Sequence, residues 1–139
     1  AESVYFSKKT ACIYTVRGDS MSNVFYAQQI CRVESAINEI SKNDFSKVPD
    51  FEEQLCRYSC FMCFAILASA AENDCFDSIR AIQENIIHSL HREKIQNAKF
   101  DNITLKSKVS IFLMKKNQYR AAFYFLNLCK RIKTILRKG

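Results

Sequence analysis

A chain of 139 residues is long enough for one domain with a sizeable core, and its 48% hydrophobic residues exclude an intrinsically disordered chain. Two glycines and one proline are too few for a sheet joined by tight turns, so the composition favours helices. The charge is one-sided: residues 102–139 carry ten basic residues and no acidic one, whereas residues 1–101 carry 11 basic and 14 acidic residues.

The predicted elements begin with an N-terminal arm. Residues 1–20 are expected to be extended or weakly structured, and the alternation over residues 10–16 also permits a short strand. The first helix is predicted at about residues 22–42, because β-branched apolar residues recur there at helical spacing. These residues are Ile30, Val33, Ile37 and Ile40. We expect a single helical domain over residues 21–139.

A central helix is predicted at about residues 50–71. Pro49 breaks the chain before it, and Asp50 with the acidic residues of the next turn suits a helix N-terminus. The second half of this helix is apolar on nearly all sides, which is typical of a buried helix. The longest apolar run, residues 58–71, has only 14 residues, so we expect a core helix and no membrane span.

Three further helices are predicted at about residues 76–92, 104–116 and 119–137. In the first of them Ile79, Ile82, Ile86 and Leu90 recur at helical spacing, and Asn102 or Thr104 is a suitable N-cap for the second. In the last helix the stripe consists of Ala122, Leu126, Cys129, Ile132 and Leu136. Together these patterns predict an all-α domain of about five or six antiparallel helices, packed as hairpins around the buried central helix.

The junctions between the predicted helices are similar to one another. Asn43, Asn73 and Asn117 each open a polar turn that leads to an aromatic side chain. Asparagine tolerates the left-handed conformation that ends many helices, and we expect the aromatic side chain to close the end of the hairpin. The third junction, with small residues at Ser110 and Ala122, resembles a tetratricopeptide-type hairpin over about 35 residues.

The stretch 24–136 is also loosely similar to the TRF-homology domain of telomeric proteins. The similarity lies in Phe25-Tyr26, the Asn43-Asp44-Phe45 turn, residues 72–76, residues 105–109 and the Asn117-Gln118-Tyr119 turn. That family has an all-helical docking and dimerisation fold that binds short peptides from partner proteins. The resemblance therefore implies a helical scaffold that recognises a peptide.

The seven cysteines suit a reducing, intracellular location, nuclear or cytoplasmic, because their number is odd and most occupy apolar positions of helices. Cys56, Cys60 and Cys63 have the C-x3-C-x2-C spacing of radical SAM iron–sulfur enzymes, and with His88 or His91 they offer ligands for zinc. They also share one helix face, which favours packing as small apolar side chains. We expect no metal and no cofactor, and we expect both histidines at an exposed helix end.

The sequence contains no recognisable catalytic motif. With two glycines, a glycine-dependent nucleotide loop is excluded, and neither a P-loop nor an HExxH pattern occurs. No nucleophile is tied to either histidine by a known spacing. The chain is therefore expected not to be an enzyme.

The acid-free segment after Asp101 is the main functional signal, because basic faces attract acidic proteins, nucleic acid and anionic lipids. Our leading hypothesis is a protein–protein interaction scaffold that docks a peptide or helix with acidic and apolar residues, with homodimerisation as a further expectation. The expected partner-binding residues beside the last two helices are Lys115, Lys116, Tyr119, Arg120, Phe123, Phe125, Lys130, Arg131 and Lys133. The alternatives are a nucleic-acid or chromatin-binding domain that uses the basic face, and a viral Bcl-2-like helical decoy.

Overall fold

Six α-helices are present in residues 23–139, the part of the chain that the computed structural model describes. They are α1 (Asn23–Ser41), α2 (Phe51–Glu72), α3 (Ser78–Ile87), α4 (His91–Asn97), α5 (Leu105–Lys115) and α6 (Tyr119–Lys138). No strand occurs among these residues, so the predicted all-α class is confirmed. The predicted N-terminal arm lies outside the described residues.

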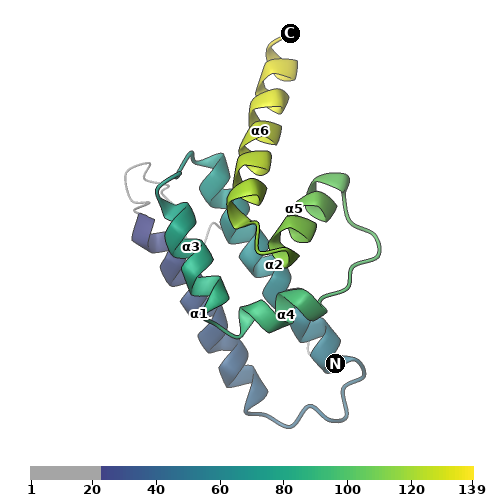
Figure 1. The fold of residues 1–139 in the computed structure, drawn as a ribbon. Helices are drawn as coiled ribbons and strands as arrows, with labels where there is room; N and C mark the ends of the chain where they lie inside the picture. The colour runs from purple at the N-terminus through teal and green to yellow at the C-terminus, as the bar shows by residue number, and fades with distance from the viewer. Residues whose placement is uncertain (1–22) are drawn as a thin grey trace, which may run out of the picture.

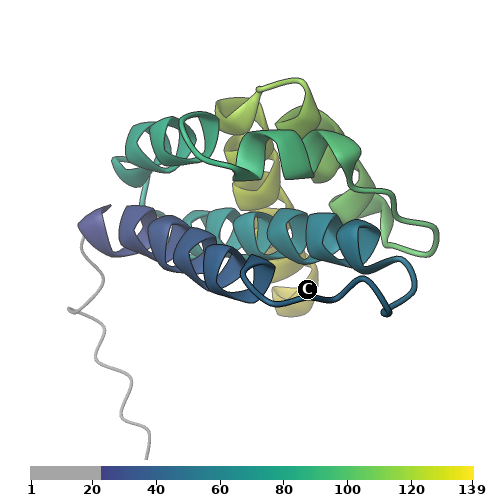
Figure 2. The same ribbon diagram turned by 90° about the horizontal axis from the view of Figure 1, so that it is seen from below.

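The helices form two layers (Figure 2). The antiparallel pair α1 and α2 forms one layer, and α3, α4 and α5 lie on one side of this pair. α2 is central, since it packs against each of the other five helices. α6 begins in the second layer, crosses α2 and projects beyond the other helices at its C-terminal end (Figure 1). Every residue from Arg131 onward is consequently exposed.

The core is built around α2, as predicted. Its buried positions include Cys60, Cys63 and Leu67, followed by the adjacent small residues Ala70 and Ala71. Small side chains let a crossing helix approach closely, and α6 crosses α2 near this end. Among the described residues, α2 alone is long and apolar enough to cross a membrane by length and composition, yet half of its apolar stretch is buried inside the domain. Such burial is typical of a core helix.

The prediction of one helix over residues 76–92 is wrong, because α3 ends at Ile87 and α4 begins at His91. Ser89 lies in the break. Its hydroxyl donates to the Ile86 carbonyl at 2.9 Å and accepts from the His91 backbone N–H at 3.2 Å. A serine side chain that bonds to nearby backbone groups in this way competes with the helical pattern. The break turns α4 out of line with α3, toward α2.

The helix ends follow the predicted turn chemistry in part. Thr104 is the N-cap of α5, where its side chain accepts from the Ser107 backbone N–H at 3.3 Å. Asn117 is left-handed, with φ of 56°, but after α2 the left-handed residue is Asp74 and not Asn73. Asp50 is the N-cap of α2, at the expected helix N-terminus, but it is left-handed and its side chain makes no cap hydrogen bond. Carboxylate and amide side chains tolerate this conformation better than other non-glycine residues do.

Candidate functional site

Helix α6 has two apolar faces. The inner face consists of Tyr119, Ala122, Phe123 and Leu126, which are all buried, and α6 packs against α2 and α5. The centroid of the Phe123 ring lies 5.4 Å from that of the Phe76 ring. Tyr119 and Phe123 were expected to supply pockets for a partner, but their burial gives them a role in the core instead.

The second apolar face of α6, which we call the outer stripe, is open to solvent. It consists of Tyr124, Leu128, Ile132, Ile135 and Leu136, which are 48–75% exposed. At 3.6 residues per turn, Leu128 and Ile132 lie on the opposite side of the helix from Leu126 and Phe123. The expectation that Ile132 and Leu136 continue the core-facing stripe is therefore wrong.

The outer stripe was missed because periodicity reveals that a helix has an apolar face without revealing what covers that face. A signal for it did exist in the sequence. Residues 119–138 contain more apolar positions than one face of a helix can hold, so some had to point away from the core. The sequence still could not indicate which of the two faces the core would take.

Basic residues lie on both sides of the outer stripe. α6 contains six basic residues and no acidic one. Those in the exposed C-terminal half are Lys130, Arg131, Lys133, Arg137 and Lys138. Exposed like charges that are not neutralised within their own helix produce a positive potential around the apolar stripe, which attracts an acidic ligand.

A polar anchor holds α6 where it leaves the bundle. The Asn127 amide donates to the Ala71 carbonyl at 2.8 Å and to the Asp74 carboxylate at 2.7 Å. Lys130 donates to the same carboxylate at 2.6 Å, and the Asn127 amide oxygen accepts from Arg131 at 3.0 Å. The hydrogen bonds from Lys130 and Asn127 hold the pKa of Asp74 below its ordinary value. The anchor therefore stabilises the fold above the ordinary carboxyl pKa, and this contribution is lost as the pH falls through the lowered one.

Replacing Asn127 with alanine is expected to lower the free energy of unfolding by about 1–3 kcal/mol, because the buried side chain loses its hydrogen bonds to the Ala71 carbonyl, the Asp74 carboxylate and Arg131. Urea unfolding followed by circular dichroism measures the change. Asn38→Ala on α1 is the matched control, since Asn38 is exposed and its loss should cost no more than about 0.5 kcal/mol. Equal effects of the two substitutions would contradict the anchor.

A basic groove runs beside the anchor, between the end of α2, the start of α5 and α6. Its volume is about 460 Å³. The residues that line it are Glu72, Lys106, Cys129, Lys130, Lys133, Thr134 and Arg137. Four cations thus line the groove with one carboxylate, Glu72, whose Oε1 lies 3.7 Å from Lys106 Nζ, and one of the four, Lys130, is already paired with Asp74. The groove is suited to an anionic group.

Three of the other expected partner-binding residues, Lys115, Lys116 and Arg120, lie apart from these cations, around the turn between α5 and α6. Lys115 donates to the Ala98 carbonyl, and Lys116 lies over the Phe112 ring at 5.9 Å. Phe125 is partly buried. Ten residues of helix separate Arg120 from Lys130, which is about 15 Å along the axis. Of the expected set, the structure therefore brings Lys130 and Lys133 together on the groove, whereas the Arg131 side chain bonds to Asn127 and does not line it.

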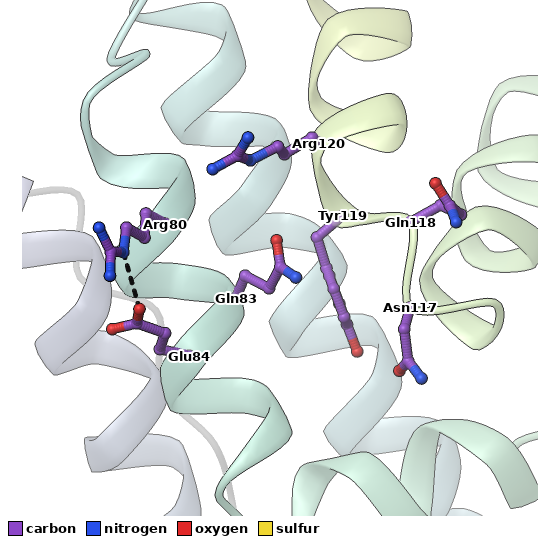
Figure 3. Close-up of a pocket in the computed structure, with 7 residues that line it drawn as sticks. All are labelled: Arg80, Gln83, Glu84, Asn117, Gln118, Tyr119 and Arg120. Carbon is purple, nitrogen blue, oxygen red and sulfur yellow. Dashed lines mark hydrogen bonds and ion pairs between the residues drawn. The ribbon is translucent and has the colours of Figure 1, made fainter.

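Arg120 lines a polar cavity of about 390 Å³ between α3 and the start of α6 (Figure 3). Figure 3 shows its side chain extending from α6 toward α3, where Arg80 and Glu84 form an ion pair at 2.8 Å. The remaining lining residues are Gln83, Asn117, Gln118 and Tyr119. Because Glu84 already neutralises Arg80, this cavity is less basic than the groove at the other end of α6.

His91 is buried, so the prediction of an exposed pair of histidines is wrong for it, while His88 is exposed. The Ser59 hydroxyl lies 2.6 Å from His91 Nδ1, and His91 Nε2 lies 3.1 Å from the Ile30 carbonyl. Since the carbonyl only accepts, Nε2 donates to it and the hydroxyl donates to Nδ1. These bonds join α1, α2 and α4. Ser59 is fully buried too, so its hydroxyl cannot reach a substrate.

The cysteines of α2 are packed in the core. Burial raises the pKa of Cys60 to about 11 and raises that of Cys63 further, so both remain protonated thiols. His91 cannot join them as a ligand in this arrangement because both of its ring nitrogens are occupied. Among residues 23–139, no three His, Cys, Asp or Glu side chains are grouped so that they could hold a metal ion.

Fold and surface together define a six-helix domain whose last helix presents an uncovered apolar stripe bordered by cations. Neither a protein-family model, nor a curated protein, nor a solved structure matches this chain. The resemblances to tetratricopeptide hairpins and to the TRF-homology domain therefore stay expectations. The exposed apolar stripe and the cations of α6 are the features from which a function can be proposed.

Proposed function

We propose that this domain is a non-enzymatic protein-interaction module that docks a segment of a partner protein on the outer stripe of α6. The observation that carries the proposal is the exposure of five large apolar side chains on one continuous helix face. Globular domains rarely leave a contiguous apolar patch uncovered unless it serves as an interaction site. Burial of such a patch by a partner supplies the main favourable term in association.

The cations around the outer stripe indicate the chemistry of the partner. A segment that covers Leu128, Ile132 and Ile135 needs apolar residues of its own, and acidic residues at its edges would meet Arg131 and Lys133. Opposite charges of this kind speed association and fix the register more than they add affinity. The partner is therefore a protein segment in which acidic residues flank apolar ones.

Changing Leu128 and Ile132 to aspartate is expected to abolish capture of the partner from a cell extract and to leave the unfolding temperature unchanged. Both side chains are exposed, so the fold does not depend on them, whereas two carboxylates would oppose an acidic ligand. Quantitative mass spectrometry of proteins retained by the intact chain measures the loss.

The matched control for this test changes Leu105 and Phe112 of α5 to aspartate, because both are also large, apolar and exposed. A protein retained by the wild type and by the control, and lost only with the α6 variant, supports the proposal. If every protein that the wild type retains is also retained by the α6 variant, the outer stripe is not the docking site.

Nucleic-acid binding is the second candidate, and the convergence of Lys106, Lys130, Lys133 and Arg137 on one groove favours it. Such binding would weaken steeply with salt, since each phosphate contact releases counterions. Titration of labelled duplex DNA and single-stranded RNA at several salt concentrations tests it. Binding lost on Lys133→Glu and Arg137→Glu, but kept on Leu128→Asp and Ile132→Asp, would place nucleic acid ahead of a protein partner.

A further inference from the structure

The apolar residues on the outward side of α6 follow the repeat of a coiled coil. Ala121, Phe125, Leu128, Ile132 and Ile135 are separated by four, three, four and three residues. Leu128, Ile132 and Ile135 are 54%, 48% and 69% exposed, Ala121 is exposed and Phe125 is partly buried. Alternating steps of four and three residues are the spacing at which two helices pack side by side along a narrow seam.

We infer that the exposed seam of α6 forms one strand of a short two-stranded coiled coil whose other strand is an acidic helix of a different protein. The inference rests on the proposed function and specifies the partner's conformation and charge pattern. In heptad notation Phe125 and Ile132 occupy position a, whereas Ala121, Leu128 and Ile135 occupy position d. At the centre of the seam, Ile132 at a beside Leu128 at d is the combination that favours two strands in parallel coiled coils.

Charge favours a different protein over a second copy of this chain. Arg131 and Lys138 occupy position g, beside the seam, and α6 offers no acidic residue to pair with them. A second copy of α6 would bring another six cations alongside the first six. Like charges across a coiled coil destabilise it, whereas glutamate at the flanking positions of the partner would pair with these cations.

The bundle prepares α6 for this role. Residues 121–138 form about 27 Å of helix, which is short for a coiled coil. Tyr119, Ala122, Phe123 and Leu126 fix the first half of α6 in the core, and the Asn127 anchor fixes its exit. Because this strand is already helical, binding has to order only the partner, which offsets the short length.

A labelled synthetic peptide of about three heptads, with isoleucine at a, leucine at d and glutamate at e and g, tests the inference on the full chain. Fluorescence anisotropy should give a dissociation constant in the micromolar range, and circular dichroism should show the peptide gaining helix. A peptide with lysine at e and g should bind at least about tenfold more weakly. Equal binding of the two peptides would overturn the inference.

Two charge reversals in the protein provide the matched comparison. Arg131→Glu at position g should weaken binding of the acidic peptide about tenfold and improve binding of the lysine peptide. Arg137→Glu changes the charge equally, but at position f on the far side of the helix, and should change affinity less than about threefold. Thermal melting verifies that both variants stay folded, since Arg131 also bonds to Asn127. If the two reversals changed the affinity equally, the peptide would bind by general charge attraction and not in the register of a coiled coil.

Two alternative partners for the seam, a second copy of this chain and a lipid surface, can be tested with the same protein. Sedimentation velocity should show that the wild-type chain does not self-associate through the seam. If it does self-associate, and Ile132→Asp abolishes the association, a second copy of the chain is the partner. Vesicles containing phosphatidylserine should bind more weakly than the acidic peptide, and preference for the vesicles would make a lipid surface the occupant. If the Leu128→Asp and Ile132→Asp variant loses a cellular partner whose docking segment is not helical, the proposed function stands and the coiled coil does not.

Discussion

Replacing Phe123 with alanine is expected to lower the free energy of unfolding by about 3–5 kcal/mol. The Phe123 side chain is fully buried, and its ring packs beside the rings of Phe76 and Tyr124. Truncation removes the buried ring and leaves a cavity where α6 packs on the rest of the domain. Domains of this size have about 5–15 kcal/mol of stability, so the loss is a large part of the total. Urea unfolding followed by circular dichroism measures it.

Phe112→Ala on α5 is the matched control for Phe123→Ala. The same atoms are removed, but Phe112 is 59% exposed, so the expected change is within about 0.5 kcal/mol. The comparison also separates core from partner-binding roles on α6. A Phe123→Ala variant that kept its stability and lost only a partner would contradict the assignment of this residue to the inner face.

Replacing His91 with alanine is expected to lower the free energy of unfolding by about 2–5 kcal/mol. The substitution leaves a cavity between α1, α2 and α4, and it removes the hydrogen-bond partners of the Ser59 hydroxyl and the Ile30 carbonyl. His88→Ala, three residues earlier and exposed, is the control and should have little effect. If the two substitutions cost the same in urea unfolding, the buried network does not stabilise the domain.

The same histidine makes stability depend on pH. Burial lowers the pKa of His91 below 6.5, although the Ile30 carbonyl and the charge of Glu34 act in the opposite direction. Between the lowered pKa and 6.5 the unfolded chain binds more protons than the folded one, so stability falls as the pH is lowered through this range. Below the lowered pKa this contribution stops changing. In a His91→Gln variant, the free energy of unfolding should no longer fall with pH over this range. If urea unfolding at several pH values showed the same pH dependence for the variant and the wild type, the buried imidazole would not be neutral.

Most helices could be predicted because their signals are local. The ends of α1, α2, α5 and α6 fall within a few residues of the sequence-based boundaries, which rested on apolar spacing, Pro49 and Thr104. The break between α3 and α4 was missed, since it depends on the side-chain hydrogen bonds of Ser89. Apolar spacing continues across that break and therefore conceals it.

The candidate site was predicted less well than the fold, for a physical reason. Its cations could be predicted from the sequence, because the segment after Asp101 contains basic residues and no acidic one. The burial of Phe123 and the exposure of Ile132 depend on the angle at which α6 crosses α2. That angle is set by contacts between residues far apart in the chain, such as the bonds from Asn127 to Ala71 and Asp74. No local pattern contains this information.

The most direct test of a docking site on the outer stripe is photo-crosslinking from single positions of α6 in the full chain. A photoreactive amino acid is placed in turn at Leu128, Ile132 and Ile135, and at Thr134 and Arg137, which are exposed on other faces of the helix. After irradiation in cell extract, crosslinked products are identified by mass spectrometry. The outer stripe should yield one common protein that the other two positions do not yield. Crosslinking of that protein only from Thr134 and Arg137, or equally from all five positions, would contradict the proposed site.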